Sequence, residues 1–184
     1  MTTNNFIVYA CPVGELNRQI ELYLQKSQES CGKNRAHLYM PHCTLTGFFP
    51  DEQGAILLYV QALEQAYQQT KKANISLDVR LKNLIFHPDW HGLEIDAPGL
   101  QKLIQTFMKL ADSPMRSQEI RPKEWLHLSF AYEFDRKHRE TLIQLAEEID
   151  PFAPVTWELR FYQRHEDSSW TCHFNEQLSM NNDR

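Results

Sequence analysis

Two histidines of the 184-residue chain are each followed, two positions later, by a hydroxyl residue: His42 by Thr44, and His127 by Ser129. Both pairs lie in short apolar stretches typical of β-strands. Residues i and i+2 of a strand point to the same face, so each pair would present an imidazole beside a hydroxyl. Hydrolysis of a phosphodiester needs a base, an acid and donors for the phosphoryl oxygens. These four side chains could supply all three without a metal.

The surroundings of the two motifs also repeat. An apolar residue follows each histidine at the third position (Leu45 and Phe130) and a phenylalanine at the seventh (Phe49 and Phe134). An amphipathic helical pattern follows both stretches. Chance alone would give about one such motif among eight histidines, so the repeated context carries the inference. Two similar βα units predict an α+β protein with two pseudo-symmetric antiparallel-sheet lobes, outer helices and a central cleft that both histidines face.

The apolar periodicity predicts which elements position the motifs. A first strand is expected over 6–11, closed by Pro12 and Gly14, and a helix over about 15–30. Alternation of apolar and polar residues predicts a half-buried strand over 75–81. The remaining expected elements are the two histidine strands, helices near 52–67, 100–110 and 136–149, and strands over 93–95, 155–162 and 170–174.

Composition bounds the class of protein. With 42% hydrophobic residues, the chain fits one globular domain over residues 1–184. No segment has the length of a membrane helix or the pattern of a signal peptide, so a cytoplasmic location is the expectation. The cysteines form no C-x-x-C pair, which fits reduced thiols and indicates no disulfide; they are Cys11, Cys31, Cys43 and Cys172.

Proteins that bind long nucleic acid gain affinity from many Lys and Arg side chains that neutralise phosphates. The net charge of −5, from 19 basic and 24 acidic residues, argues against such binding. We therefore expect a small phosphoester or nucleotide substrate, no membrane partner, and a monomer as the default state.

The residues carry a resemblance to a known family. Pro41-His42-Cys43-Thr44-Leu45 and Leu126-His127-Leu128-Ser129-Phe130 resemble the paired signature of the 2H phosphoesterase superfamily, which includes LigT-like proteins and cyclic phosphodiesterases. The wider patterns around both motifs look most like the 2H domain of TULA (UBASH) proteins. Those proteins carry further ubiquitin-binding, SH3-type and phosphatase modules, for which we expect no room in 184 residues.

The resemblance implies a bilobal fold, no metal or other cofactor, and action on 2′,3′-cyclic phosphates. It implies His42 and His127 as the catalytic pair, with His127 as base and His42 as acid, and Thr44 and Ser129 as the phosphate-binding pair. Aromatic residues near the cleft of related enzymes match Tyr9 and Tyr132, either of which could stack on a base.

Other interpretations of these residues are open at this point. The histidines could be structural and the tyrosines part of the core. His87 and His91, with Asp89 between them in the sequence, could be offered as a metal site, but no third ligand is evident, so a hairpin turn with exposed histidines is favoured. Residues 164–167 are expected to form a solvated turn that could gate the cleft. The rival functions are an RNA end-processing or ligase-like enzyme and a non-catalytic module that binds nucleotide or phosphate.

Overall fold

The computed structural model describes residues 4–178 of the chain. Within that range, eight strands form one antiparallel sheet in the order β4-β5-β6-β2-β1-β7-β8, and β3 pairs with β1 at the side of this path. The strands are β1 (Asn4–Gly14), β2 (Cys43–Thr44), β3 (Phe49–Asp51), β4 (Arg80–Phe86), β5 (Trp90–Asp96), β6 (Leu126–Tyr132), β7 (Val155–Arg164) and β8 (Trp170–Leu178).

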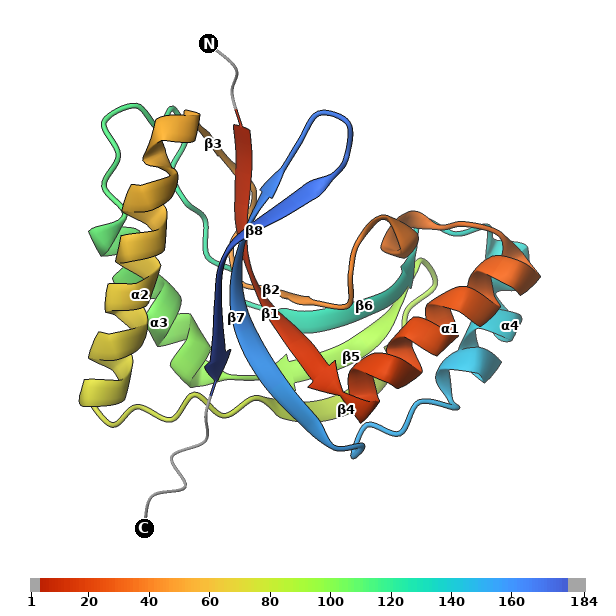
Figure 1. Ribbon diagram of the computed structural model, residues 1–184. Coiled ribbons are helices and arrows are strands. Elements are labelled where there is room, and N and C mark those ends of the chain that lie inside the picture. Colours follow the sequence, from red (N-terminus) through yellow and green to blue (C-terminus); the bar gives the residue numbers. More distant parts are fainter. Residues whose placement is uncertain (1–3, 179–184) are drawn as a thin grey trace.

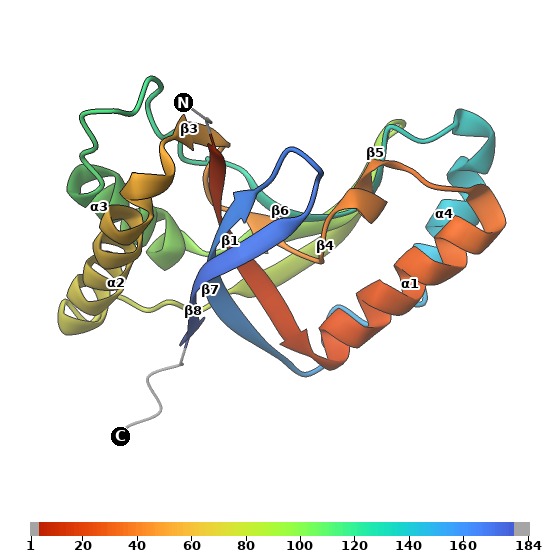
Figure 2. The same ribbon diagram turned by 45° about the horizontal axis from the view of Figure 1, so that its top comes forward.

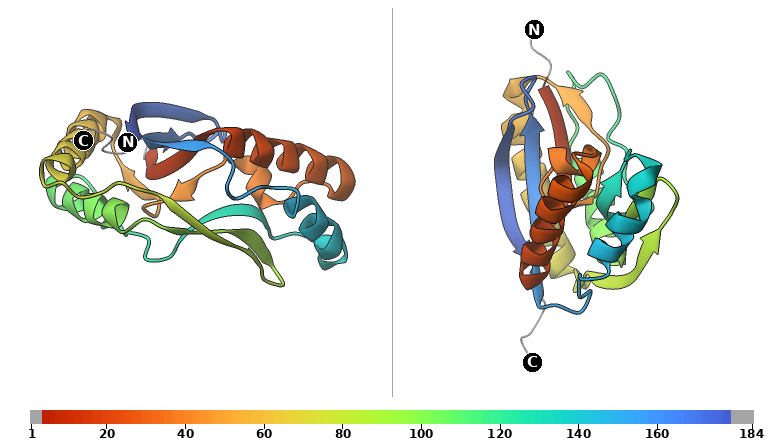
Figure 3. Two further views of the ribbon diagram at one scale, coloured as in Figure 1. Left: turned by 90° about the horizontal axis from the view of Figure 1, so that it is seen from below. Right: turned by 90° about the vertical axis from the view of Figure 1, so that its right-hand side faces the viewer.

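Two helix pairs lie at opposite ends of the molecule, as Figures 1 and 2 show. Helix α1 (Glu15–Cys31) packs against α4 (Arg139–Ala146), and α2 (Ile56–Lys72) packs against α3 (Pro98–Leu110). The left view of Figure 3, from below, shows the same separation. Short 3-10 turns span Arg35–Leu38, Gln53–Ala55 and Arg136–His138.

The order of elements occurs twice along the chain. Apart from β3, the 3-10 turns and the final β8, the series β1-α1-β2-α2-β4 is followed by β5-α3-β6-α4-β7. In the sheet, β4-β5-β6 lies on one side of the centre and β7-β1-β2 on the other, so exchanging the two series reverses the order of these six strands. The same exchange maps the helix pair α1–α4 onto α3–α2. The predicted repeat of βα units is therefore present in the topology.

Strand β1 separates the main core from the opposite face of the sheet. Its residues Phe6 and Val8 are buried in the main core, which the helices cover. Ile7, Tyr9 and Cys11 alternate with them and face the other way, as the two-residue period of a strand requires. On that second face they join a small aromatic-rich cluster with Tyr162, Met40, Phe48 and Trp170.

Three expected elements differ from the structure. Strand β1 continues through Pro12 to Gly14. The strand predicted over 75–81 is wrong, because β4 begins only at Arg80. The chain before it instead crosses the start of α3, where the Ser76 carbonyl lies so close to Gly99 that an added Cβ would meet it at 1.8 Å. The last expected helix ends at Ala146, before Ile149.

The first histidine stretch is also less regular than predicted. Only Cys43–Thr44 and Phe49–Asp51 form strands within it. The amides of Leu45 and Thr46 both donate to the Val8 carbonyl, and Val8 N donates to Thr46 Oγ1 at 3.1 Å. A side-chain oxygen thus replaces a backbone partner and interrupts the ladder.

The other expected helices and strands are present, with shifted ends. The helix near 52–67 begins at Ile56 and continues to Lys72. All four cysteines are free. Among the described residues, no helix combines the length and the apolar character that crossing a membrane requires.

Candidate active site

The register between β2 and β6 brings the four motif side chains together. Cys43 pairs with Leu128, and both of these side chains are buried in the main core. The flanking residues therefore face the opposite side of the sheet. Continuing this antiparallel register by one residue in each direction places Thr44 beside His127 and His42 beside Ser129. All four of these side chains are half-buried.

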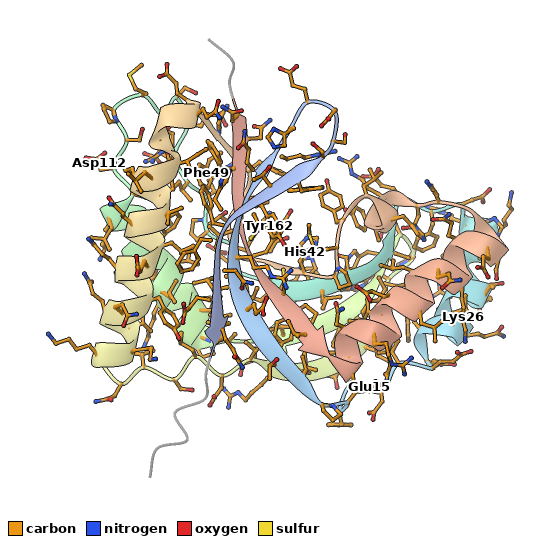
Figure 4. The ribbon with its side chains drawn as sticks, in the orientation of Figure 1. Glu15, Lys26, His42, Phe49, Asp112 and Tyr162 are labelled. Carbon is orange, nitrogen blue, oxygen red and sulfur yellow. The ribbon has the colours of Figure 1, made fainter. Side chains whose placement is uncertain are left out.

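His42 is held against the second face of the sheet. Its Nδ1 donates a hydrogen bond to the Met40 carbonyl at 2.7 Å, which leaves the lone pair of the neutral ring on Nε2. The rings of Tyr9 and Tyr39 lie 4.0 and 5.5 Å from the imidazole. Burial lowers the pKa of His42 to about 4, against the effect of the Met40 carbonyl, and His127 lowers it further. Figure 4 shows His42 near the centre of the molecule, between the helix pairs.

His127 lies between two tryptophans. The Trp125 ring is 4.1 Å from the imidazole, and the Trp90 ring meets it edge-on at 5.0 Å. Burial lowers the pKa of His127, the Trp125 carbonyl raises it, and the nearby Lys123 ammonium lowers it. Within residues 4–178, the buried Nδ1 of His127 has no hydrogen-bond partner. Burial thus favours the neutral form of both imidazoles in the free protein, and an anion between them would raise both pKa values.

The two hydroxyls differ in their partners. Ser129 Oγ accepts a hydrogen bond from Trp90 Nε1 at 2.9 Å. Thr44 Oγ1 has no hydrogen-bond partner in the described part of the chain. Each hydroxyl thus retains a proton that it can donate to a ligand oxygen.

The two tyrosines proposed to stack on a base have different exposures. Tyr9 is 1% exposed and packs against His42, so its ring has no open face, and this burial does not fit the expected stacking role. Tyr132 is half-buried on β6; burial raises its pKa to about 12, and the charge of Arg35 opposes that shift. Stacking by Tyr132 remains a prediction.

Sequence reasoning missed a group of side chains beside His42. The Arg164 guanidinium lies over the rings of Tyr39 and Trp170, at 5.6 and 5.7 Å. Among residues 4–178, Arg164 forms no ion pair with a carboxylate. Alternation along β7 and β8 could have placed Arg164 and Trp170 on the histidine face, whereas Tyr39 follows the 3-10 turn Arg35–Leu38 and has no such signal. The loop after Arg164 is the predicted turn, whereas its role as a gate remains a prediction.

The predicted hairpin turn connects β4 to β5. His87 N closes it by donating a hydrogen bond to the Trp90 carbonyl at 2.8 Å. His87 is exposed, but the expectation of an exposed His91 is wrong. That ring is fully buried against Phe86 and Phe134, because the strand alternation turns it into the core. Among the described residues, no group of three His, Cys, Asp or Glu side chains could hold a metal.

Comparison with known proteins extends the resemblance. The chain is 31% identical over 162 residues to ecdysteroid-phosphate phosphatase of Bombyx mori, and 32% identical over 165 residues to human ubiquitin-associated and SH3 domain-containing protein B. Each alignment covers 86% of this chain but only about a quarter of the relative, 24% and 25%. No family model matches the chain. The predicted likeness to TULA (UBASH) proteins is thus confirmed for one segment of those proteins.

Proposed function

We propose that the chain is a metal-independent cyclic phosphodiesterase that hydrolyses 2′,3′-cyclic nucleotides, or related small cyclic phosphoesters, to phosphomonoesters. The observation that carries this proposal is the β2–β6 register. Continued by one residue in each direction, this register brings Thr44 beside His127 and His42 beside Ser129 on one face of the sheet. An in-line displacement needs a base and an acid on opposite sides of the phosphorus, with donors for its oxygens, and this arrangement can supply them.

The proposal includes the bilobal 2H phosphoesterase fold. Support comes from the exchange of the two element series, which reverses the order of the six strands and maps one helix pair onto the other. The exchange maps β2 onto β6, and therefore the stretch of His42 onto that of His127. The cleft would lie where the two halves meet.

The proposed reaction begins with both imidazoles neutral. The phosphate anion raises their pKa values, and one imidazole takes up a proton. In the assignment that the resemblance implies, His127 takes a proton from water while His42, protonated, gives one to the leaving oxygen. Thr44 and Ser129 donate to the non-bridging oxygens. Because the hydrogen bond to Met40 fixes Nδ1 of His42 as a donor, Nε2 is the atom that exchanges the proton.

In this proposal the substrate is small and the protein acts in the cytoplasm. The net charge of −5 supports neither a long nucleic acid nor an anionic membrane as partner. A relative named as a phosphatase supports phosphoester hydrolysis as the broad class. The chain spans only about a quarter of that protein, so its steroid substrate is not carried over.

Hydrolysis of the four 2′,3′-cyclic mononucleotides in EDTA, with products read by phosphorus NMR, tests this proposal. We expect turnover in wild type and in His87→Ala, which removes an exposed histidine outside the site. Binding of these nucleotides without turnover would select the non-catalytic module instead. Joining or trimming of RNA ends, with no action on mononucleotides, would select the ligase-like enzyme.

A further inference from the structure

Trp90 contacts both functional side chains of the second motif. Its indole Nε1 donates to Ser129 Oγ at 2.9 Å, and its ring meets the His127 imidazole edge-on at 5.0 Å. Trp90 belongs to β5, whereas Ser129 and His127 belong to β6. One side chain of the neighbouring strand therefore bridges the hydroxyl and the imidazole.

A glycine makes this contact sterically feasible. In the register of β5 with β6, Gly92 is the residue beside Ser129. A Cβ at Gly92 would lie 2.4 Å from a carbon of the Trp90 ring and 2.3 Å from the Leu128 carbonyl. The indole therefore lies over Gly92, in space that any other residue would fill. The register shift between His91 and Gly92 accompanies this arrangement.

The first half of the molecule fills the equivalent space differently. Tyr9 of β1 is the residue beside Thr44, as Gly92 is beside Ser129. The Tyr9 ring packs on His42 at 4.0 Å, but among the described residues no hydrogen bond joins Tyr9 to Thr44. Only the second half thus couples its hydroxyl to an aromatic donor.

The indole bond determines how Ser129 can act. A serine hydroxyl has one proton and two lone pairs, and Trp90 N–H uses one lone pair. The hydroxyl proton is then kept from pointing at the indole and is left for another acceptor, such as a ligand oxygen. Without the indole, the hydroxyl could rotate and would lose this preferred direction.

We propose that Trp90 is a positioning residue: it orients the Ser129 hydroxyl as a donor to a phosphoryl oxygen and fixes the His127 ring beside it. This inference rests on the proposed function for its catalytic meaning. The coupling of the indole to the hydroxyl can be measured without turnover.

The first experiment records the indole N–H resonances by NMR, with the Trp90 signal identified by its loss in Trp90→Phe. We expect Ser129→Ala to shift this signal and to speed its exchange with solvent. Ser129→Thr, which retains the acceptor, and Thr44→Val should leave it in place. An indole signal that Ser129→Ala does not move would overturn the proposal, whatever the activity of the protein.

The second experiment measures inorganic phosphate binding by calorimetry. Trp90→Phe and Ser129→Ala should each weaken binding about 3–10-fold, the scale of one hydrogen bond. The double variant should lose less affinity than the product of the two single effects, because part of the effect of Trp90 acts through Ser129. Trp157→Phe is the matched control, since its buried indole N–H has no partner among the described residues. Effects that multiply in the double variant would contradict the proposal.

A protein that binds no phosphate, but whose Trp90 signal responds to Ser129→Ala, would count against the proposed function and not against the indole contact. A Trp90→Phe protein with wild-type phosphate affinity would overturn the positioning role. Unfolding curves of each variant separate both results from a loss of the fold.

Discussion

The two halves of the site hold the same pair of side chains in different ways. His42 comes immediately before the two-residue strand β2 and packs on the buried ring of Tyr9, and its Nδ1 is fixed by the Met40 carbonyl. His127 lies within a seven-residue strand, between two tryptophans, and its Nδ1 has no hydrogen-bond partner in residues 4–178. The first imidazole is fixed by a hydrogen bond, and the second by aromatic packing.

This difference shows how a repeated motif can acquire two roles. Burial lowers the pKa of both histidines; the Lys123 ammonium also lowers that of His127, whereas for His42 the additional lowering comes from His127. In the neutral state both rings can act as bases. Which one keeps the added proton depends on the ligand and on these unequal surroundings.

The largest expected effect is that of removing either imidazole. His42→Ala and His127→Ala should each lower kcat on 2′,3′-cyclic nucleotides about 10²–10⁴-fold, because each removes one proton transfer. The double variant should lose little more than the worse single variant, since both groups act in the same step. Initial rates at saturating substrate measure this. Retention of wild-type kcat by either single variant would contradict the shared site.

The roles of the histidines can be separated by the leaving group. In the hydrolysis of a 4-nitrophenyl phosphodiester, the nitrophenolate departs without needing a proton. Loss of the general acid should therefore matter less for this substrate than for a cyclic nucleotide. We expect the rate of His42→Ala, expressed as a fraction of the wild-type rate, to be at least tenfold higher on the nitrophenyl ester than on the cyclic nucleotide. His127→Ala should be equally impaired on both substrates. The reverse pattern would make His127 the acid and His42 the base, and the two-histidine mechanism would still hold.

The hydroxyls should show a smaller effect, and an unequal one. Thr44→Val and Ser129→Ala should each lower kcat/KM about tenfold by removing one donor to the phosphate. Ser129→Ala also leaves the Trp90 N–H unpaired, so urea unfolding should show a loss of about 1 kcal/mol that Thr44→Val does not share. Thr46→Val is the control, because the buried Thr46 hydroxyl bonds Val8 N and should affect stability alone.

The last expected effect concerns stability in acid. Burial lowers the pKa of His91 to about 4. Unfolded His91 takes up a proton below about pH 6.5, whereas the folded ring stays neutral until about pH 4, so stability falls as the pH falls through this window. Between pH 7 and pH 5 the wild type should therefore lose about 1–2 kcal/mol of unfolding free energy that His91→Leu does not lose, as measured by urea unfolding. His87→Gln should keep the wild-type pH dependence.

The sequence predicted the two motifs and their common face because strand alternation is a local property. The buried neighbours Cys43 and Leu128 mark it clearly. The same reasoning failed over residues 75–79, since alternation cannot tell a paired strand from an extended segment packed on a helix. It also missed how short β2 is, because the bond from Val8 N to Thr46 joins residues far apart in the chain.

The motif residues could be found from sequence, whereas their supports could not. Trp90 looked like a turn residue, and only the register of β5 with β6 places it over Gly92 and beside Ser129. Tyr9 was proposed as a stacking surface, but its burial under His42 depends on the pairing of β1 with β2. Such contacts form across strands, so no spacing along the chain encodes them.

The most direct test of the shared site is an NMR titration of His42 and His127 with and without inorganic phosphate. Each resonance is assigned by the corresponding alanine variant. In the free protein both pKa values should lie below 6.5, that of His42 at about 4. Saturation with phosphate should raise both, because one anion lies between the two rings. A rise confined to one histidine, or to neither, would contradict the claim that the two halves act on the same phosphoryl group.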